Sequence, residues 1–180
     1  NVNQAFGQLL QFSDKIDEQI YKREDTVNYL DKVISEYIST ALATPNLNVN
    51  ISQALSSYYL MLVDIERISD YAVNMNHQAT KRLQGDMTIS EIEIVEHMKK
   101  LCVDMKNDLS DVEEAERKDD VIDSLVSSWR EAQIQALKQQ KCSSEVSMML
   151  SRIFTDFERI NDHALNVSQE FDKINIEIPE

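Results

Sequence analysis

The 180-residue chain has few of the residues that make tight turns. It contains only two glycines and two prolines, whereas the many turns of a β-rich fold depend on Gly, Pro and Asn. We therefore expect few connections between long elements, which favours an all-α fold.

Cysteines and long apolar runs are also scarce. The only two cysteines, Cys102 and Cys142, have no metal-type spacing and cannot form a framework of several disulfides. This favours a reducing compartment, so we expect a cytoplasmic protein. No segment approaches the roughly 20 apolar residues of a membrane-spanning helix, and there is neither a signal peptide nor an initiator Met. The missing Met indicates a fragment, a processed chain or a shifted numbering.

Basic residues are outnumbered, with 18 Lys and Arg against 32 Asp and Glu, so the formal net charge is −14. Such a surface repels nucleic acid and anionic lipid, and we expect neither as a ligand. It attracts metal cations and basic partners, although solubility alone is a sufficient explanation. The chain has no Gly-rich phosphate loop, no GxSxG and no Glu-x-x-His of di-iron enzymes. We therefore expect no enzymatic activity.

A few breaks divide the chain into long helical segments. Pro45 cannot lie inside a helix, and Gly85-Asp86 marks a second break. Thr88 with Glu91 forms a capping box that starts a helix, and serines at 13, 110 and 143 mark softer boundaries. The expected helices span about 1–12, 14–43, 50–84, 88–109, 112–140 and 143–172.

The two halves of the chain repeat one another. The segment DIERISDYAVNM (64–75) matches DFERINDHALNV (156–167) at seven of twelve positions. Each lies on an apolar seam of helical period, which runs from Tyr58 through Ile65 to Ala79 in one half and from Val146 to Phe171 in the other. The sequence therefore predicts one domain, 1–180, of two tandem three-helix bundles, divided as 1–86 and 87–180.

The first helix of the first half is short. It has about 12 residues before Ser13, whereas its counterpart at 88–109 has about 22. We interpret the sequence as starting partway along this helix, and expect a further segment upstream in the parent protein.

Pairs of carboxylates recur at the same place in both halves. Glu66 and Asp70 lie four residues apart, as do Glu158 and Asp162, and this spacing puts each pair on one helix face. The two negative charges repel one another, and a metal ion would remove the repulsion by using both groups as ligands. The alternative is a solvated acidic face.

A single carboxylate also interrupts the seam of the second helix in each half. Glu24 falls between Ile20 and Val27, and Asp119 takes the matching position. Because a buried, unpaired carboxylate is unstable, we expect a cation beside each. The alternatives are an exposed seam end or a salt bridge, with Arg67 or Arg159 as the partner.

The acids form two candidate metal-binding sets, one in each half. Carboxylates suit hard cations and also iron and zinc. His163 adjoins Asp162 but points about 100° away from it on a helix, so we expect it to flank the second set, with a surface role in preference to metal binding. The first set is Glu24, Glu66 and Asp70 with Asn28 as a neutral helper, and the second is Asp119, Asp123, Glu158 and Asp162.

The repeated segments DIERISDYAVN and DFERINDHALN resemble the E(D)xxxD signature of PhoU proteins, close to DLERIGDHAxNI. The resemblance covers essentially the whole chain and implies a pair of three-helix bundles. It also implies multinuclear iron or zinc clusters held by the acids of both sets. The chain departs from the family pattern where Ser69 and Asn161 replace the usual glycine, and where Asn28 replaces the counterpart of Asp123.

The resemblance implies a regulatory protein of phosphate uptake in one of two settings. A PhoU-like domain forms the cytoplasmic tail of sodium/phosphate cotransporters, tethered to the inner face of the membrane, and the short first helix favours this setting. A free-standing PhoU protein instead contacts a phosphate ABC transporter and a sensor histidine kinase, and a homodimer is a further expected assembly. The alternatives are a metal-free helical scaffold and, third, a di-metal enzyme.

Overall fold

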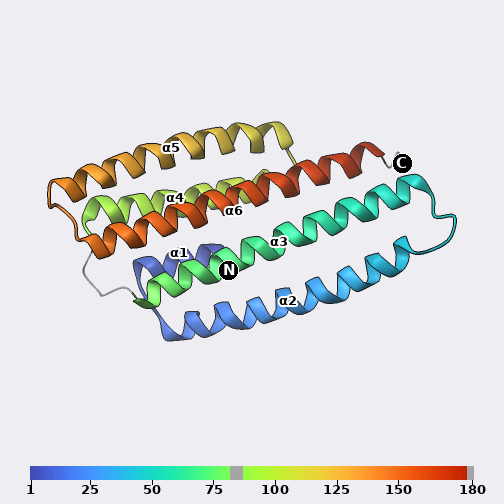
Figure 1. Ribbon diagram of the computed structural model, residues 1–180, viewed down its shortest axis with the longest axis horizontal. Coiled ribbons are helices and arrows are strands. Elements are labelled where there is room, and N and C mark those ends of the chain that lie inside the picture. Colours follow the sequence, from blue (N-terminus) through green and yellow to red (C-terminus); the bar gives the residue numbers. More distant parts are fainter. Residues whose placement is uncertain (82–86, 178–180) are drawn as a thin grey trace.

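The computed structural model describes residues 1–81 and 87–177, and within these ranges it consists of six α-helices (Figure 1). No helix in this part of the chain has the length and apolar character needed to cross a bilayer. The helices are α1 (Val2–Leu10), α2 (Asp14–Leu42), α3 (Val49–Lys81), α4 (Ile89–Asn107), α5 (Val112–Lys138) and α6 (Ser144–Glu177).

The helix boundaries largely follow the predicted breaks. The Thr88 hydroxyl accepts from the amide of Glu91 while the Glu91 carboxylate accepts from the amide of Thr88, which confirms the capping box of α4. The last helix continues to Glu177, five residues beyond the predicted end. The predicted end of the third helix and the break at Gly85-Asp86 lie outside the described residues.

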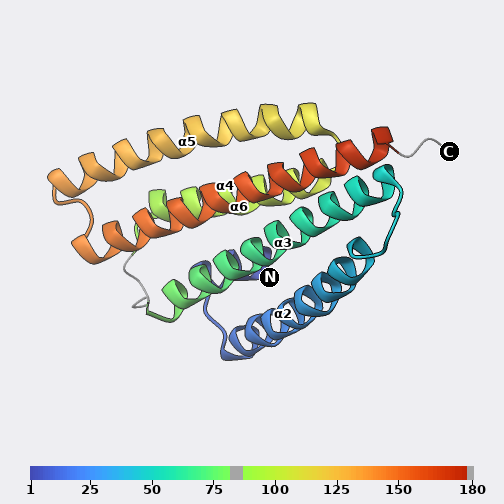
Figure 2. The same cartoon turned by 45° about the vertical axis from the view of Figure 1, so that its right-hand side comes forward.

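Two long helices form the centre of the molecule. α3 and α6 pack against each other along much of their length, with α2 beside α3 and α5 beside α6 (Figures 1 and 2). α1 packs against α3, and α4 packs against α6. α1 and α4 also pack against each other. This arrangement confirms the predicted all-α fold of two three-helix bundles side by side.

The apolar seam of α6 lies in the core as predicted. Its residues from Val146 to Ala164 are buried, and Phe6 of α1 packs edge-on against Phe157 with ring centroids 6.1 Å apart. The last seam residue, Phe171, is exposed.

The matching seam of α3 is buried at only one end, which corrects the sequence prediction. Ala72, Met75 and Ala79 are buried, but Tyr58 and Ile65 are each 47% exposed. The physical reason is the length of α1, whose hydrogen bonds reach α3 from Ser69 to Asn76 and no further toward Tyr58. The α2 seam is interrupted, because Ile20 and Glu24 are buried, Leu30 and Ile34 are exposed, and Ile38 is buried again.

Candidate functional site

Glu24 brings a carboxylate into the interior of the first bundle, as its place in the α2 seam predicts. It is only 8% exposed. The Ser69 hydroxyl on α3 donates to its Oε2, and Asn1 Nδ2 in turn donates to the Ser69 oxygen at 3.2 Å. The other oxygen, Oε1, is buried and has no hydrogen-bond partner. One half of this carboxylate is therefore unsatisfied.

Burial raises the pKa of Glu24, and the nearby Asp70 carboxylate raises it further, while the hydrogen bond from Ser69 lowers it. The pKa of Glu66 is also raised, first by burial and then by Asp70, with Arg67 acting in the opposite direction. The three acids of the first set thus lie close enough for their charges to act on one another.

The arginine that follows Glu66 forms weak ion pairs with the acids on its own helix. Arg67 Nε lies 3.8 Å from Glu66 Oε2, and Nη1 lies 3.6 Å from Asp70 Oδ2. Both separations exceed hydrogen-bond length, and the Arg67 side chain is largely exposed. Within the described residues Glu24 has no ion pair with Arg67, so the salt-bridge alternative does not account for its burial.

Asp31 also belongs to this acidic group, although it is not among the acids expected from the sequence. Its charge also raises the pKa of Glu66. Asp31 lies seven residues after Glu24 on α2, and residues seven apart share a helix face. That spacing is the signal that would have identified it.

Asp119 occupies the corresponding position in the second bundle. Its Oδ1 is buried without a hydrogen-bond partner, like Oε1 of Glu24. Burial raises the pKa of Asp119 to about 6, and the carboxylates of Asp123 and Asp162 add to the effect. Both repeats therefore place an unsatisfied carboxylate oxygen near further acids. Asp162 pairs with Arg159 on its own helix at 3.3 Å, and in the described chain Asp119 has no such pair.

Glu158, the fourth acid of the second set, already has a cationic partner. Arg130 Nη2 of α5 donates to Glu158 Oε2 at 2.5 Å and to Thr155 Oγ1 at 3.1 Å. The guanidinium also lies over the ring of Phe154, 5.7 Å from its centroid. Arg130 is not among the residues expected from the sequence, although it lies seven residues after Asp123 on one face of α5.

The side chains do not converge on a metal-binding geometry as they stand. Among residues 1–81 and 87–177, no three Asp, Glu, His or Cys side chains form a group that could hold a metal ion. The chemistry of the donors nevertheless fits a cation, because each set combines a buried, unsatisfied carboxylate oxygen with neighbouring acids. The metal therefore remains a prediction.

His163 pairs with an acid of the other repeat that belongs to neither set. Its Nδ1 lies 2.7 Å from Oδ1 of Asp64 on α3, and its side chain is 20% exposed. The ring also stacks on Tyr71, with centroids 5.8 Å apart. Its partner lies 99 residues away in the sequence, so helical periodicity alone could not have found the contact.

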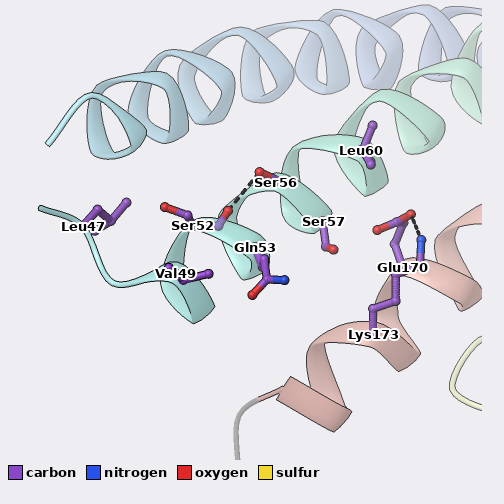
Figure 3. A pocket seen from close by; sticks show the side chains of 9 residues that line it. All are labelled: Leu47, Val49, Ser52, Gln53, Ser56, Ser57, Leu60, Glu170 and Lys173. Atoms are coloured by element: carbon purple, nitrogen blue, oxygen red, sulfur yellow. Dashed lines mark hydrogen bonds and ion pairs between the residues drawn. The ribbon is translucent and has the colours of Figure 1, made fainter. Parts of the chain in front are cut away.

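A separate hollow of about 460 Å³ lies between the start of α3 and the end of α6 (Figure 3). Three of its polar side chains already have partners. Lys173 pairs with Glu170 at 2.5 Å, and the Ser56 hydroxyl donates to the carbonyl of Ser52 at 2.9 Å. The hollow thus presents no free cation, and the carboxylate sets are the stronger candidates for a functional site.

Comparisons with known proteins agree with the motif and the fold. The PhoU domain model matches residues 1–79 and 89–171. A relative is the phosphate-specific transport system accessory protein PhoU homolog 1 of Thermotoga maritima. It is 23% identical to this chain over an alignment of 182 residues, which covers 94% of this chain and 77% of the relative. Its fold is similar to the crystal structure of PhoU from Pseudomonas aeruginosa, with a TM-score of 0.85, 19% identity and coverage of 98% of this chain and 89% of that one. The chain belongs to the PhoU domain family.

Proposed function

We propose that this protein is a regulatory accessory protein of a phosphate transport system and has no catalytic role. The observation that carries the proposal is the family match across both repeats, together with a relative whose name places it in a phosphate-specific transport system. That relative supports the setting of a PhoU-type regulator acting on a separate transporter, rather than the cotransporter tail favoured by the short first helix. A sensor histidine kinase is a second proposed partner.

The proposed regulator carries iron or zinc at the two carboxylate sets. Glu24 with Glu66 and Asp70 would hold the ion in the first bundle. In the second bundle Asp119, with Asp123 and Asp162, would do so. The support is that equivalent helices each carry a buried carboxylate oxygen that lacks a partner. When bound, the metal would supply positive charge that offsets the repulsion among these acids.

Binding at the second set is opposed by an ion pair at Glu158. Arg130 holds one oxygen of this carboxylate, Oε2, and so restrains the turn of Glu158 toward Asp119 and Asp162. Arg130 therefore competes with the metal for Glu158, whereas Glu66 in the first set faces only the long contact to Arg67. We expect the first set to fill at lower metal concentration.

Elemental analysis of protein purified without chelator tests the metal site. We expect more than about one iron or zinc per chain, lost when Glu66→Gln and Glu158→Gln are combined. The matched control combines Glu18→Gln and Glu113→Gln, which are exposed acids on α2 and α5. Absence of metal from the wild-type protein would favour the metal-free scaffold, and equal metal content in both double variants would show that the ion is bound elsewhere.

Phosphate uptake in cells tests the regulatory role. We expect a strain without the gene to take up excess phosphate when phosphate is plentiful, and the intact gene to restore control. A transporter complex captured from membranes should also retain the protein. Normal uptake in the deletion strain would contradict the proposal, and an O₂-dependent or hydrolytic turnover lost in the Glu66→Gln, Glu158→Gln variant would indicate an enzyme instead.

A further inference from the structure

Each repeat carries one exposed arginine beside its pair of acids. Arg67 Nη1 lies 3.6 Å from Oδ2 of Asp70, and Arg159 Nη1 lies 3.3 Å from Oδ2 of Asp162. The two arginine side chains are 55% and 58% exposed. Because exposed pairs of this kind contribute little to stability, the fold itself does not require an arginine at either position.

The two arginines lie at the same level of the central helix pair. α3 and α6 run in opposite directions (Figure 1), and Asp64 of α3 contacts His163 of α6. Arg67 follows Asp64 by three residues, so it lies opposite position 160, which precedes His163 by three residues. Arg159 is adjacent to that position. The register thus brings the two arginines to within about one residue, or about 1.5 Å along the helix axes, of directly opposite positions.

Both arginines lie on the face of the α3–α6 pair that is turned away from α1, which we call the open face. α1 reaches α3 at Ser69, whose oxygen accepts a hydrogen bond from Asn1. Arg67 precedes Ser69 by two residues, so the two side chains leave α3 about 160° apart. α3 and α6 have equivalent places in two matching bundles and are antiparallel. The rotation that relates them therefore carries Arg67 to Arg159 on the same face.

The acid sets flank this pair of arginines. The charge of Asp70 acts on Glu24 of α2, and the charge of Asp162 acts on Asp119 of α5, so each set lies on the outer side of the central helices. Without metal, these acids pair with the guanidinium groups and give the open face a negative potential, which repels anions. A cation in each set would offset that charge and compete for the carboxylates that the arginines contact.

We propose that Arg67 and Arg159 together bind a phosphate group on the open face once cations occupy both acid sets. This inference rests on the proposed metal sites. The axes of packed helices lie about 8–10 Å apart, so one arginine from each helix, at one level, can contact the same tetrahedral anion. The planar guanidinium donates two parallel hydrogen bonds to phosphate oxygens, for which arginine is better suited than lysine. The group belongs either to inorganic phosphate or to a phosphorylated partner.

A variant with the arginines unmasked tests the proposal without metal. It replaces the three acids that contact Arg67 and Arg159 and combines Glu66→Gln, Asp70→Asn and Asp162→Asn. In EDTA, calorimetric titration with inorganic phosphate should show binding to this variant at least about tenfold tighter than to the wild type. Adding Arg67→Gln and Arg159→Gln should remove the gain. The matched control adds Arg23→Gln and Arg117→Gln, which are exposed arginines on α2 and α5, and should keep it.

The wild-type protein loaded with Zn²⁺ tests the effect of the cation. It should bind inorganic phosphate at least about tenfold more tightly than the EDTA-treated protein. Arg67→Gln with Arg159→Gln should reverse this gain and leave the zinc content unchanged. Titration with glycyl-phosphoseryl-glycine distinguishes the two sources of the group. Tighter binding of this peptide would indicate a phosphorylated partner, and tighter binding of inorganic phosphate would indicate the free ion.

Two results would overturn the proposal and leave the metal sites intact. In one, the wild type takes up zinc at the acid sets, but phosphate affinity is the same with and without the two arginines, so that the anion binds the metal alone. In the other, the unmasked variant folds with a normal thermal unfolding midpoint and binds phosphate no better than the wild type. Failure of the wild type to take up zinc would overturn the proposed metal sites and this inference together.

Discussion

Asp64 on α3 and His163 on α6 form a direct polar contact between the two repeats, with Oδ1 and Nδ1 2.7 Å apart. The same carboxylate oxygen accepts a hydrogen bond from Asn166 at 3.2 Å. The side chains of Asp64 and His163 are 14% and 20% exposed, respectively. Because the contact is largely screened from water and lies between the two central helices, it fixes their relative register.

We expect Asp64→Asn and His163→Gln each to lower the free energy of unfolding by about 1–2 kcal/mol, because each leaves a partly buried polar partner unsatisfied. Urea unfolding of both single variants and the double variant measures the coupling between them. The free energy of unfolding should fall by less in the double variant than the sum of its decreases in the two single variants. The exposed Asp25→Asn on α2 is the control, with a change within about 0.5 kcal/mol. Additive losses would show that the contact does not couple the repeats.

The contact also marks a limit of prediction from the sequence. Helix positions follow from turn residues and caps within one segment, so the boundaries of α2 and α5 agree with the sequence to within two residues. The partner of His163 depends on which helices face each other, and periodicity gives no information about that. A similar limit applies to Arg130, whose pairing with Glu158 joins two helices.

Burial of a seam is predictable only when the covering element is known. Ile65 and Phe157 occupy equivalent positions, and the sequence pattern predicts that both are buried. Only Phe157 is, because the rings of Phe6 on α1 and Trp129 on α5 pack against it, while α1 stops short of Ile65. For Glu24 the sequence pattern predicts a buried position, and the structure confirms it, because α1 covers this end of the seam.

We expect Glu24→Gln to have opposite effects with and without metal. In EDTA the variant should be more stable than the wild type at pH 7.5, because it removes a buried charge whose pKa is raised by desolvation. With iron or zinc present the wild type should be the more stable protein, because the variant loses an anionic ligand. Thermal unfolding in the two buffers measures both differences.

The exposed Glu18→Gln on the same helix is the control for this experiment, because its side chain is 73% exposed. It should behave as the wild type in both buffers. If Glu24→Gln changed stability equally with EDTA and with metal, Glu24 would have a purely structural role.

We expect Arg130→Gln to lower the stability of the metal-free protein and to raise the metal affinity of the second set. The substitution removes the 2.5 Å bond to Glu158, and we expect the free energy of unfolding in EDTA to fall by about 1–3 kcal/mol. The freed carboxylate becomes available as a ligand beside Asp119 and Asp162. A calorimetric titration with Zn²⁺ should show that the variant binds the ion more tightly than the wild type at one site only. The matched control is Arg152→Gln on α6, which is exposed, and weaker binding in Arg130→Gln would indicate that the arginine supports the site.

Asp156 on α6 gives a prediction about pH. Burial raises its pKa to about 6 from the ordinary value of 3.8, with Arg152 opposing the shift. The folded state therefore binds the proton more tightly than the unfolded state, so the stability that protonated Asp156 contributes is present below about pH 4 and is lost as pH rises to about 6. Asp156→Asn keeps a neutral side chain at every pH. Urea unfolding in EDTA should show no difference from the wild type near pH 4 and a variant more stable by roughly 1–3 kcal/mol at pH 7.5. A constant offset across this range would mean that the carboxyl group titrates normally, and that the effect of the substitution comes from packing alone.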